Sequence, residues 1–447
     1  MSEPVLQTKK PQTKKPHGVS GFPEWLPEIR LMEQQWLDHI RKGFESYGYA
    51  NIETPAVELL DVLLAKGETD KEIYVLKRLQ EEADAEGESR FGLHYDLTVP
   101  MARYVAQHFA GLTFPFKRYQ MQKVWRGERP QEGRYREFYQ CDIDVIAVDN
   151  LPLAFDAEMP ATLYDVINGL GLAEGICLHI SNRKILDGFM QGLSIADSAS
   201  CIRVIDKMDK IGAAGVAEQL RVLGLTEPAI AALTSLASIK VGGTAFASQV
   251  AALGVRHALL EEGITELAFV MENLRHLPSQ AVIADLSIAR GFDYYTGTVY
   301  EGKLLQYPSF GSVVAGGRYD DLAGSFINKK LPGVGVSLGF SRLFGKMVHE
   351  GVVKSERRCP TDVLVVLPSE EKRAEALKTA QQLRSRGLRV ETYHAPQKLA
   401  KQLVYAEKKG IPYVWFPPFE ENGVHEVKNM QSGEQKISTV ADFSLVL

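Results

Sequence analysis

The chain has 447 residues, a length that predicts about two to four domains at roughly 100–200 residues each. Its composition, 45% hydrophobic and 24% charged, excludes a disordered, collagen-like or low-complexity chain and indicates a globular protein. The 51 lysines and arginines against 56 acidic residues give a net charge of −5, so any site for a polyanion must be a local patch.

Cysteine spacing and the N-terminal segment indicate a reduced, cytoplasmic protein. The four cysteines, Cys141, Cys177, Cys201 and Cys359, form no CxxC pair, which argues against a zinc site and against a disulfide framework. Residues 1–16 are rich in Lys and Pro and lack the apolar core of a signal peptide, so we expect a disordered tail. No apolar run approaches ~18 residues, so no membrane-spanning segment is predicted.

The first predicted elements are helical. Apolar residues recur every three or four positions over residues 27–47, which predicts a long amphipathic helix. Residues 49–57 favour an extended segment, and residues 59–65 a second helix. The acidic stretch 80–88 is predicted to be an exposed loop.

The middle of the chain predicts an antiparallel sheet with helices attached. Residues 90–146 form short alternating segments, interrupted by a helix at about 100–109. A further helix is expected over 152–168. Residues 182–276 are rich in Ala, Leu and Ile at helical spacing, which indicates a helical insertion before strands resume over 282–300.

A separate small α/β domain is predicted after residue 358, because strands and helices alternate there. The expected elements are a buried strand at 363–367, a helix at 371–386, a strand at 388–393, a helix ending at 409 and a strand at 413–416. This alternation favours a mostly parallel sheet.

The most basic segment of the chain is 117–136. It carries seven Lys and Arg residues against Glu128 and Glu132, a local charge of 7 − 2 = +5. Such a patch predicts phosphate binding. Its Arg-Pro-Gln-Glu-Gly core, 129–133, is typical of a turn between two strands.

The strand that follows, 137–145, should place alternate residues on opposite faces. Arg126 and Glu128 share a face before it, as Asp96 and Thr98 do on an earlier predicted strand. Isolated pairs of this kind often belong to an ordinary solvated face, and that alternative stays open. The predicted core face holds Tyr139, Cys141, Ile143 and Val145, and the candidate site face holds Phe138, Gln140, Asp142 and Asp144.

A second group of segments follows the insertion. Residues 288–301 carry Arg, Asp and adjacent tyrosines between glycines, a pattern that indicates a close backbone approach to a ligand. Paired glycines recur in 315–320, and 333–343 should lead a buried strand into a helix bearing Arg342. The superficial likeness of 339–346 to a phosphate-binding P-loop fails on glycine spacing and on the missing Ser or Thr.

Together these segments resemble class II aminoacyl-tRNA synthetases, specifically the histidyl-tRNA synthetase family. Residues 126–140 look like class motif 2 and 335–343 like motif 3, while 290–297 and 315–320 are similar to two histidine-specific signatures. Pro55 would be the motif 1 proline at a dimer interface.

The resemblance implies an α+β fold, namely a mixed, mainly antiparallel sheet flanked by helices, with a helical insertion and a C-terminal α/β anticodon-binding domain. The implied domain limits are 1–16 for a basic tail, 17–358 for the catalytic domain with its insertion at about 183–278, and 359–447 for the anticodon-binding domain. A homodimer is implied as well.

For ATP, the resemblance implies five binding residues. Arg126 would contact the α-phosphate, and Arg134 and Arg342 the other phosphates. Phe138 and Arg342 would sandwich adenine, and Glu128 would bind its amino group. ATP enters as substrate, and Mg²⁺ would be bound with ATP and pyrophosphate rather than by protein ligands alone, with no zinc.

For the amino acid, the resemblance implies catalytic roles for Arg126, Arg290 and Gln140. An imidazole has one donor and one acceptor nitrogen, so a carboxylate and a phenol can recognise both ends. The implied histidine-binding residues are Asp96, Leu97, Thr98, Arg126, Gln140, Asp144, Arg290, Tyr294 and Tyr295.

The implied partners are L-histidine, ATP and the histidine tRNA, whose acceptor end would meet Arg129 and Gln131. The implied reaction forms histidyl-adenylate and then charges the tRNA. Two alternatives remain at this point: a non-catalytic regulatory paralogue, the regulatory subunit of ATP phosphoribosyltransferase, and a binding module built on a degenerate synthetase.

Overall fold

The computed structural model describes most of the chain. The described residues are 16–65, 72–77, 90–172, 175–288, 295–321, 323–324, 326–355, 357–418, 420 and 423–445. Residues 1–15 of the predicted tail at 1–16 and the whole predicted acidic loop at 80–88 lie outside them. Among the described helices, none combines the length and the apolarity that crossing a bilayer requires.

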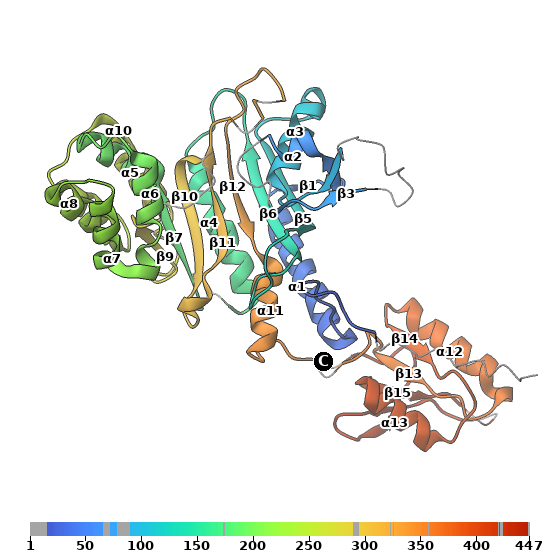
Figure 1. The fold of residues 1–447 in the computed structure, drawn as a ribbon. Coiled ribbons are helices and arrows are strands. Elements are labelled where there is room, and N and C mark those ends of the chain that lie inside the picture. The colour runs from blue at the N-terminus through green and yellow to red at the C-terminus, as the bar shows by residue number, and fades with distance from the viewer. Residues whose placement is uncertain are drawn as a thin grey trace, which may run out of the picture. The chain divides into compact units, whose positions relative to one another are not determined.

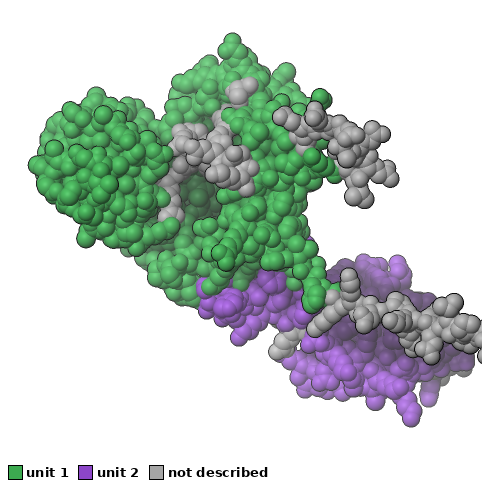
Figure 2. All heavy atoms as spheres, in the orientation of Figure 1, with its two compact units in different colours: residues 1–24, 39–345 green, residues 25–38, 346–447 purple. Residues whose placement is uncertain are grey.

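The chain divides into two compact units (Figure 2). Unit 1 comprises the residues up to Glu24 together with His39–Gly345. Unit 2 comprises Trp25–Asp38 and Lys346–Leu447.

Within its described residues, unit 1 is built on a nine-stranded sheet in the order β1-β5-β6-β12-β11-β10-β7-β9-β8 (Figure 1). The six strands from β5 to β7 in this order pair antiparallel, and the pairs β1–β5 and β7–β9 are parallel. The mixed, mainly antiparallel sheet is therefore confirmed. The strands are β1 (Ala50–Asn51), β5 (Phe116–Trp125), β6 (Glu137–Ile146), β7 (Ile176–Asn182), β8 (Lys240–Val241), β9 (Val282–Asp285), β10 (Tyr295–Leu304), β11 (Ser312–Tyr319) and β12 (Gly333–Leu338).

Helices flank this sheet close to the predicted positions. The long amphipathic pattern forms α1 (Pro27–Ser46), and α4 (Ala154–Gly169) confirms the helix expected at 152–168. Strand β12 leads into α11 (Phe340–His349), which carries Arg342 as predicted.

The helix expected at 100–109 is α3, but it begins earlier, at Thr98, and ends at His108. The strand before it, β4, ends at Leu93. The prediction that Asp96 and Thr98 share a strand face is therefore wrong, because Asp96 lies in the connection and Thr98 is the first helical residue.

Most of the segment between β7 and β9 is helical, as its Ala- and Leu-rich spacing predicted. Figure 1 shows these helices, in green, gathered beside β7 and β9. They are α5 (Arg183–Gly192), α6 (Ser198–Ile205), α7 (Met208–Val222), α8 (Glu227–Ala237), α9 (Phe246–Ala252) and α10 (Ala258–Asn273). The short strand β8 was not predicted.

A buried ion pair joins α4 to the sheet. The Asp156 carboxylate is inaccessible to solvent and lies 2.6 Å from Nη2 of Arg318 on β11. Thr298 donates to the same carboxylate at 2.5 Å, and Tyr300 donates to the Asp156 carbonyl at 2.8 Å. These contacts satisfy polar groups that would otherwise be buried without partners.

A three-stranded sheet, β2-β4-β3, lies beside α2 in unit 1. It is formed by β2 (Val57–Leu59), β3 (Val75–Leu76) and β4 (Phe91–Leu93). The helix expected at 59–65 is a single turn, α2 (Leu60–Leu63). Short 3₁₀ turns occur at Phe109–Gly111, Pro308–Phe310 and, in unit 2, Glu370–Lys372.

Unit 2 carries the predicted α/β arrangement. Its sheet has the order β14-β13-β15-β16-β17, and the first three strands are parallel, as expected. The antiparallel strands β16 and β17 were not predicted. The elements are β13 (Val363–Val365), α12 (Arg373–Ser385), β14 (Val390–Thr392), α13 (Leu399–Lys409), β15 (Tyr413–Phe416), β16 (Glu426–Asn429) and β17 (Gln435–Ile437).

Candidate active site

A cavity of about 380 Å³ lies in unit 1 over the face of β6, β11 and β12. Its walls are completed by the connection before α3, the β5–β6 loop and the start of α11. The lining residues are Asp96, Thr98, Arg126, Glu128, Gly133, Arg134, Tyr135, Phe138, Gln140, Asp142, Asp144, Tyr295, Ser312, Val313, Val314, Ala315, Gly316, Tyr319, Gly335, Val336, Ser337, Gly339 and Arg342.

Strand β6 forms one wall of the cavity, because alternate residues of a strand face the same side. Its four alternate residues Phe138, Gln140, Asp142 and Asp144 line the cavity, as predicted for the site face. Cys141, on the opposite face, is completely buried. The candidate alternative of an ordinary solvated face is excluded for this strand, because its last three site-face residues are buried.

At one end of the cavity Asp144 is held from two sides. Its Oδ2 lies 2.6 Å from Nη2 of Arg118, and its Oδ1 accepts a hydrogen bond of 3.0 Å from the Tyr319 hydroxyl. Burial raises the pKa of Asp144 to about 6, although the Arg118 charge opposes the rise. Gly335 on β12 faces this carboxylate, and a Cβ there would lie 1.9 Å from Oδ1. The glycine therefore makes room for the carboxylate.

The ion pair between Arg118 and Asp144 corrects the interpretation of the basic segment 117–136. Arg118 is fully buried, so its charge serves Asp144 rather than a phosphate. Lys117 lies 2.6 Å from Glu158, and Lys123 lies 2.6 Å from a glutamate of β6. The predicted +5 patch therefore does not exist as one phosphate site, and Arg126 and Arg134 are its members that line the cavity.

Asp96 enters from the connection before α3. Its Oδ1 accepts a hydrogen bond of 3.2 Å from the Val99 amide, near the N-terminus of the helix. Burial raises the pKa of Asp96 to about 6, and the charges of Arg126 and Arg118 act against this rise.

Gln140 and Asp142 lie between the two ends of β6. The Gln140 side-chain amide donates to Ser337 Oγ at 2.7 Å. Burial raises the pKa of Asp142 to about 7, while the Arg118 charge and a hydrogen bond from Ser337 lower it. Asp142 was not among the site residues predicted from the sequence, although the alternation along β6 had placed it on the site face.

The other end of the cavity is cationic and aromatic. Arg126 donates from Nε to the Tyr95 carbonyl at 2.9 Å, and its guanidinium lies 5.1 Å from the centre of the Phe138 ring. Glu128 accepts from Arg134 at 3.2 Å. Each of these contacts fixes a side chain before a ligand binds.

Arg342 faces this end from the first turn of α11. Its guanidinium lies 4.9 Å from the centre of the Phe310 ring, and it donates to the Phe310 carbonyl. A Cβ on Gly133 would lie 2.4 Å from the same ring, and Gly133 has a positive φ of 68°. Phe310 was not found from the sequence, because nothing in its local pattern indicated a ligand site.

Five predicted site residues do not line the cavity or lie outside the described residues. Leu97 is buried immediately before α3. Arg129 and Gln131 are exposed on the β5–β6 loop, where Gln131 and Arg134 exchange backbone hydrogen bonds. Arg290 and Tyr294 fall in residues 289–294, outside the described part, whereas Tyr295 begins β10 and lines the cavity.

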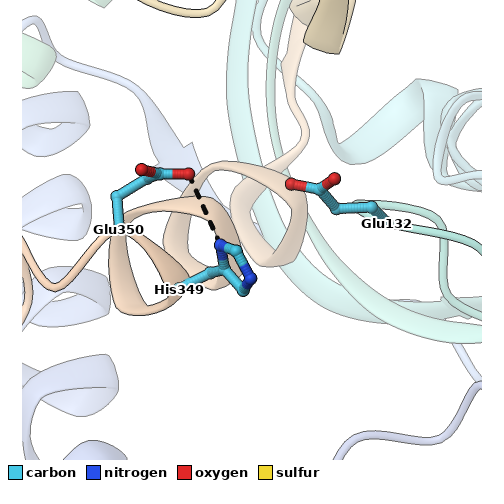
Figure 3. A group of neighbouring side chains, drawn as sticks. All are labelled: Glu132, His349 and Glu350. Carbon is cyan, nitrogen blue, oxygen red and sulfur yellow. Dashed lines mark hydrogen bonds and ion pairs between the residues drawn. The ribbon is translucent and has the colours of Figure 1, made fainter.

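The exposed end of α11 carries a separate pair of side chains. Nδ1 of His349 lies 3.4 Å from Glu350 (Figure 3). The same carboxylate forms an ion pair of 2.7 Å with Lys346. Glu132, drawn in the same figure, belongs to unit 1. No metal site is assigned to these residues.

Known protein families match the chain in two separate parts. A model of the histidyl-tRNA synthetase family matches residues 21–343. The chain belongs to this family. Residues 362–446 match the model of an anticodon binding domain. A histidine–tRNA ligase of Thermobifida fusca is 57% identical and covers 94% of this chain and 96% of its own length.

Other relatives agree over the same length. A histidine–tRNA ligase of Micrococcus luteus is 46% identical, with 96% of each chain covered. The crystal structure of histidyl-tRNA synthetase from Nostoc sp. PCC 7120 matches with a TM-score of 0.86 at 37% identity, covering 95% of this chain and 97% of that one.

A structure described as an ATP phosphoribosyltransferase regulatory subunit/histidyl-tRNA synthetase, from Bacillus halodurans, also matches. Its TM-score is 0.70, and its identity is 23%, which shows a shared fold alone. The regulatory alternative is therefore less supported than the synthetase.

Proposed function

We propose that this chain is a histidine–tRNA ligase. It joins the carboxylate of L-histidine to the α-phosphate of ATP and releases pyrophosphate. It then transfers the histidyl group from this adenylate to the 3′ end of the histidine tRNA and releases AMP. The observation that carries the proposal is the 57% identity over 94% of the chain to a histidine–tRNA ligase. A cavity with arginines at one end and buried carboxylates at the other supports it.

At the cationic end, the cavity suits a nucleoside triphosphate. Arg126 binds the α-phosphate and stabilises the charge that develops during adenylation, together with Arg290 and Gln140. Arg134 and Arg342 bind the remaining phosphates. Both arginines line the described cavity, which supports their assignment.

Adenine binds at the same end, between Phe138 and Arg342, with Glu128 accepting from its amino group. The guanidinium of Arg126 now covers the Phe138 ring at 5.1 Å, so adenine takes this place only when that guanidinium shifts toward the phosphate.

Mg²⁺ binds with ATP and supplies charge neutralisation on the phosphates. Among the described cavity residues at this end, Glu128 is the carboxylate, and it already accepts from Arg134 at 3.2 Å. This fits an ion held mainly by phosphate oxygens rather than by a protein cage.

Histidine occupies the carboxylate end. Asp144, with Tyr294 and Tyr295, binds the imidazole, while the α-ammonium and the carboxylate lie closer to the phosphates. The order of Phe138, Gln140 and Asp144 along β6 supports this direction, because successive site-face residues are about 6.5–7 Å apart along a strand. Asp96, Leu97, Thr98, Gln140, Arg126 and Arg290 complete the amino-acid site.

The tRNA contacts two parts of the chain. Arg129 and Gln131 meet the acceptor end, and their exposure on the β5–β6 loop supports this. The domain at 359–447 binds the anticodon, supported by the family model that matches 362–446. The catalytic domain is assigned to 17–358 with its insertion at about 183–278.

The chain is further proposed to act in the cytoplasm as a homodimer, with Pro55 at the interface. Cross-linking and sedimentation of the purified chain test the dimer. A monomer at the concentration at which the enzyme is active would contradict it.

The test of the function is ATP–pyrophosphate exchange with Mg²⁺, measured with each of the twenty amino acids. Exchange with histidine alone is expected, followed by charging of the histidine tRNA. Folded protein that supports no exchange with any amino acid would contradict the proposal and favour the regulatory paralogue.

A further inference from the structure

Two buried acceptor atoms on the site face of β6 have no hydrogen-bond partner among the described residues. They are Oε1 of Gln140 and Oδ1 of Asp142. Both side chains are at least nine-tenths buried, at 9% and 3% exposure, and both line the cavity. A buried acceptor without a donor is costly, by about 1–3 kcal/mol, so a ligand that brings donors is expected here.

The neighbouring carboxylate of Asp144 differs in this respect. Its Oδ2 forms an ion pair of 2.6 Å with Nη2 of Arg118, and its Oδ1 accepts a hydrogen bond of 3.0 Å from Tyr319. Asp142 lies two residues before it on the same face and has an oxygen without a donor in the described part of the chain. The two aspartates therefore have different tasks, although burial raises the pKa of both.

The number of acceptors identifies the group that would satisfy them. A primary ammonium carries three N–H donors and no acceptor, whereas a neutral imidazole carries one donor and one acceptor. Gln140 and Asp142 on β6, and Asp96 in the connection before α3, bring an amide oxygen and two carboxylates to the cavity. An ammonium has enough donors to satisfy these acceptors. A neutral imidazole, with one donor, would leave some of them without a partner.

We propose that Asp142 binds the α-ammonium of histidine, as the third acceptor beside Asp96 and Gln140. This assignment rests on the proposed function and adds a specificity-determining residue to it. It predicts that an amino-acid analogue without the ammonium leaves these acceptors unsatisfied.

The charges around Asp142 agree with a cationic ligand. Asp96 and Asp144 lie near enough to raise its pKa, and Arg118 is the cation that lowers it. Three carboxylates thus line this end of the cavity. Arg118 is already bound to Asp144. An incoming ammonium supplies a positive charge that stabilises the ionised form of Asp142.

The test compares ligands on the full-length protein. L-Histidine, histidinol, which keeps the ammonium, and imidazolepropionate, which lacks it, are measured by calorimetry or by competition in the exchange assay. In Asp142→Asn, we expect histidine and histidinol to bind about 10- to 100-fold more weakly, and imidazolepropionate within about threefold of the parent protein. ATP binding within about threefold reports that the variant is folded.

Two further variants separate the explanations. Asp144→Asn should weaken all three imidazole ligands, because that residue faces the ring in the proposed site. Asp149→Asn makes the same chemical change at an exposed position outside the lining and should change none of them.

Equal weakening of all three ligands by Asp142→Asn would overturn the inference, because it would show imidazole recognition or a general effect on the fold. Unchanged histidine binding would overturn it as well. If the parent protein itself binds no histidine and supports no exchange, the proposed function fails instead, so the two failures are distinguishable.

Discussion

Replacing Gly335 by alanine should selectively damage the amino-acid end of the cavity. The added Cβ would lie 1.9 Å from Oδ1 and 2.4 Å from Cγ of Asp144. A separation of at least 3.0 Å requires the carboxylate to retreat by about 3.0 − 1.9 = 1.1 Å. The carboxylate cannot move without losing contacts, because Arg118 and Tyr319 hold its two oxygens.

The magnitude follows from the two ways in which the clash can be relieved. If Asp144 moves, its contacts with Arg118 at 2.6 Å and Tyr319 at 3.0 Å lengthen beyond the hydrogen-bond range. If β12 moves instead, the strain destabilises the fold. Overpacking of a buried site costs about 1–3 kcal/mol, which corresponds to a loss of about 5- to 150-fold in an equilibrium constant.

The assay measures both outcomes in one protein. Histidine and ATP affinities are determined by calorimetry, and the thermal midpoint by circular dichroism. The expected result is weaker histidine binding, a lower midpoint, or both, with ATP affinity within about threefold. Gly111→Ala is the matched control, because a Cβ there meets nothing within 4 Å and its φ is not positive. Gly335→Ala with unchanged histidine affinity and unchanged midpoint would refute the reasoning.

Three more changes probe other parts of the unit. Phe310→Ala removes the ring 4.9 Å from the Arg342 guanidinium, so KM for ATP should rise about 2- to 30-fold with KM for histidine unchanged, as measured by exchange kinetics. Arg318→Leu leaves Asp156 buried without its cation, at a cost of about 3–5 kcal/mol, so the thermal midpoint should fall by roughly 6–20 °C. Burial raises the pKa of Asp142 to about 7, and only the ionised carboxylate attracts an ammonium. Histidine binding should therefore tighten from about pH 6 to about pH 8. Calorimetry should show a flatter dependence in Asp142→Asn, since the titration of the imidazole itself is common to both proteins.

Each change has its own control. Arg275→Leu, at a side chain 78% exposed, should leave the thermal midpoint nearly unchanged, because exposed ion pairs contribute little. Phe310→Tyr keeps the ring and should keep the ATP affinity. An identical pH dependence in the parent protein and Asp142→Asn would contradict the assignment of that titration to Asp142.

Periodicity predicted the parts of the fold whose burial repeats regularly. The alternation along β6 correctly placed Gln140, Asp142 and Asp144 on one face. The helical spacing from residue 27 and the strand–helix alternation after residue 358 were also correct. The short strands β8, β16 and β17 were missed, because two to four residues carry too little pattern to be distinguished from a loop.

Contacts between residues far apart in the sequence could not be predicted from local sequence patterns. Nothing in the sequence around Arg118 shows that its partner is Asp144 across the β5–β6 pair, where the two residues stand in register. The error at Asp96 and Thr98 has a different origin. The helix α3 begins at Thr98, two residues before Pro100, and proline is tolerated in the first turn of a helix, so the proline was not a boundary.

The buried pair of Arg118 and Asp144 explains how one short segment serves both ends of the cavity. If every cation of the segment faced the ligand, a positive field would repel the ammonium of an amino acid. Because Arg118 is neutralised by Asp144 and two lysines pair with glutamates outside the lining, positive charge remains at the Arg126 end. The strand β6 then presents an aromatic ring first and carboxylates last, so the sign of the cavity changes along its length. In the proposed site, the phosphates bind at one end and the ammonium toward the other, so the amino-acid carboxylate between them can meet the α-phosphate, as adenylation requires.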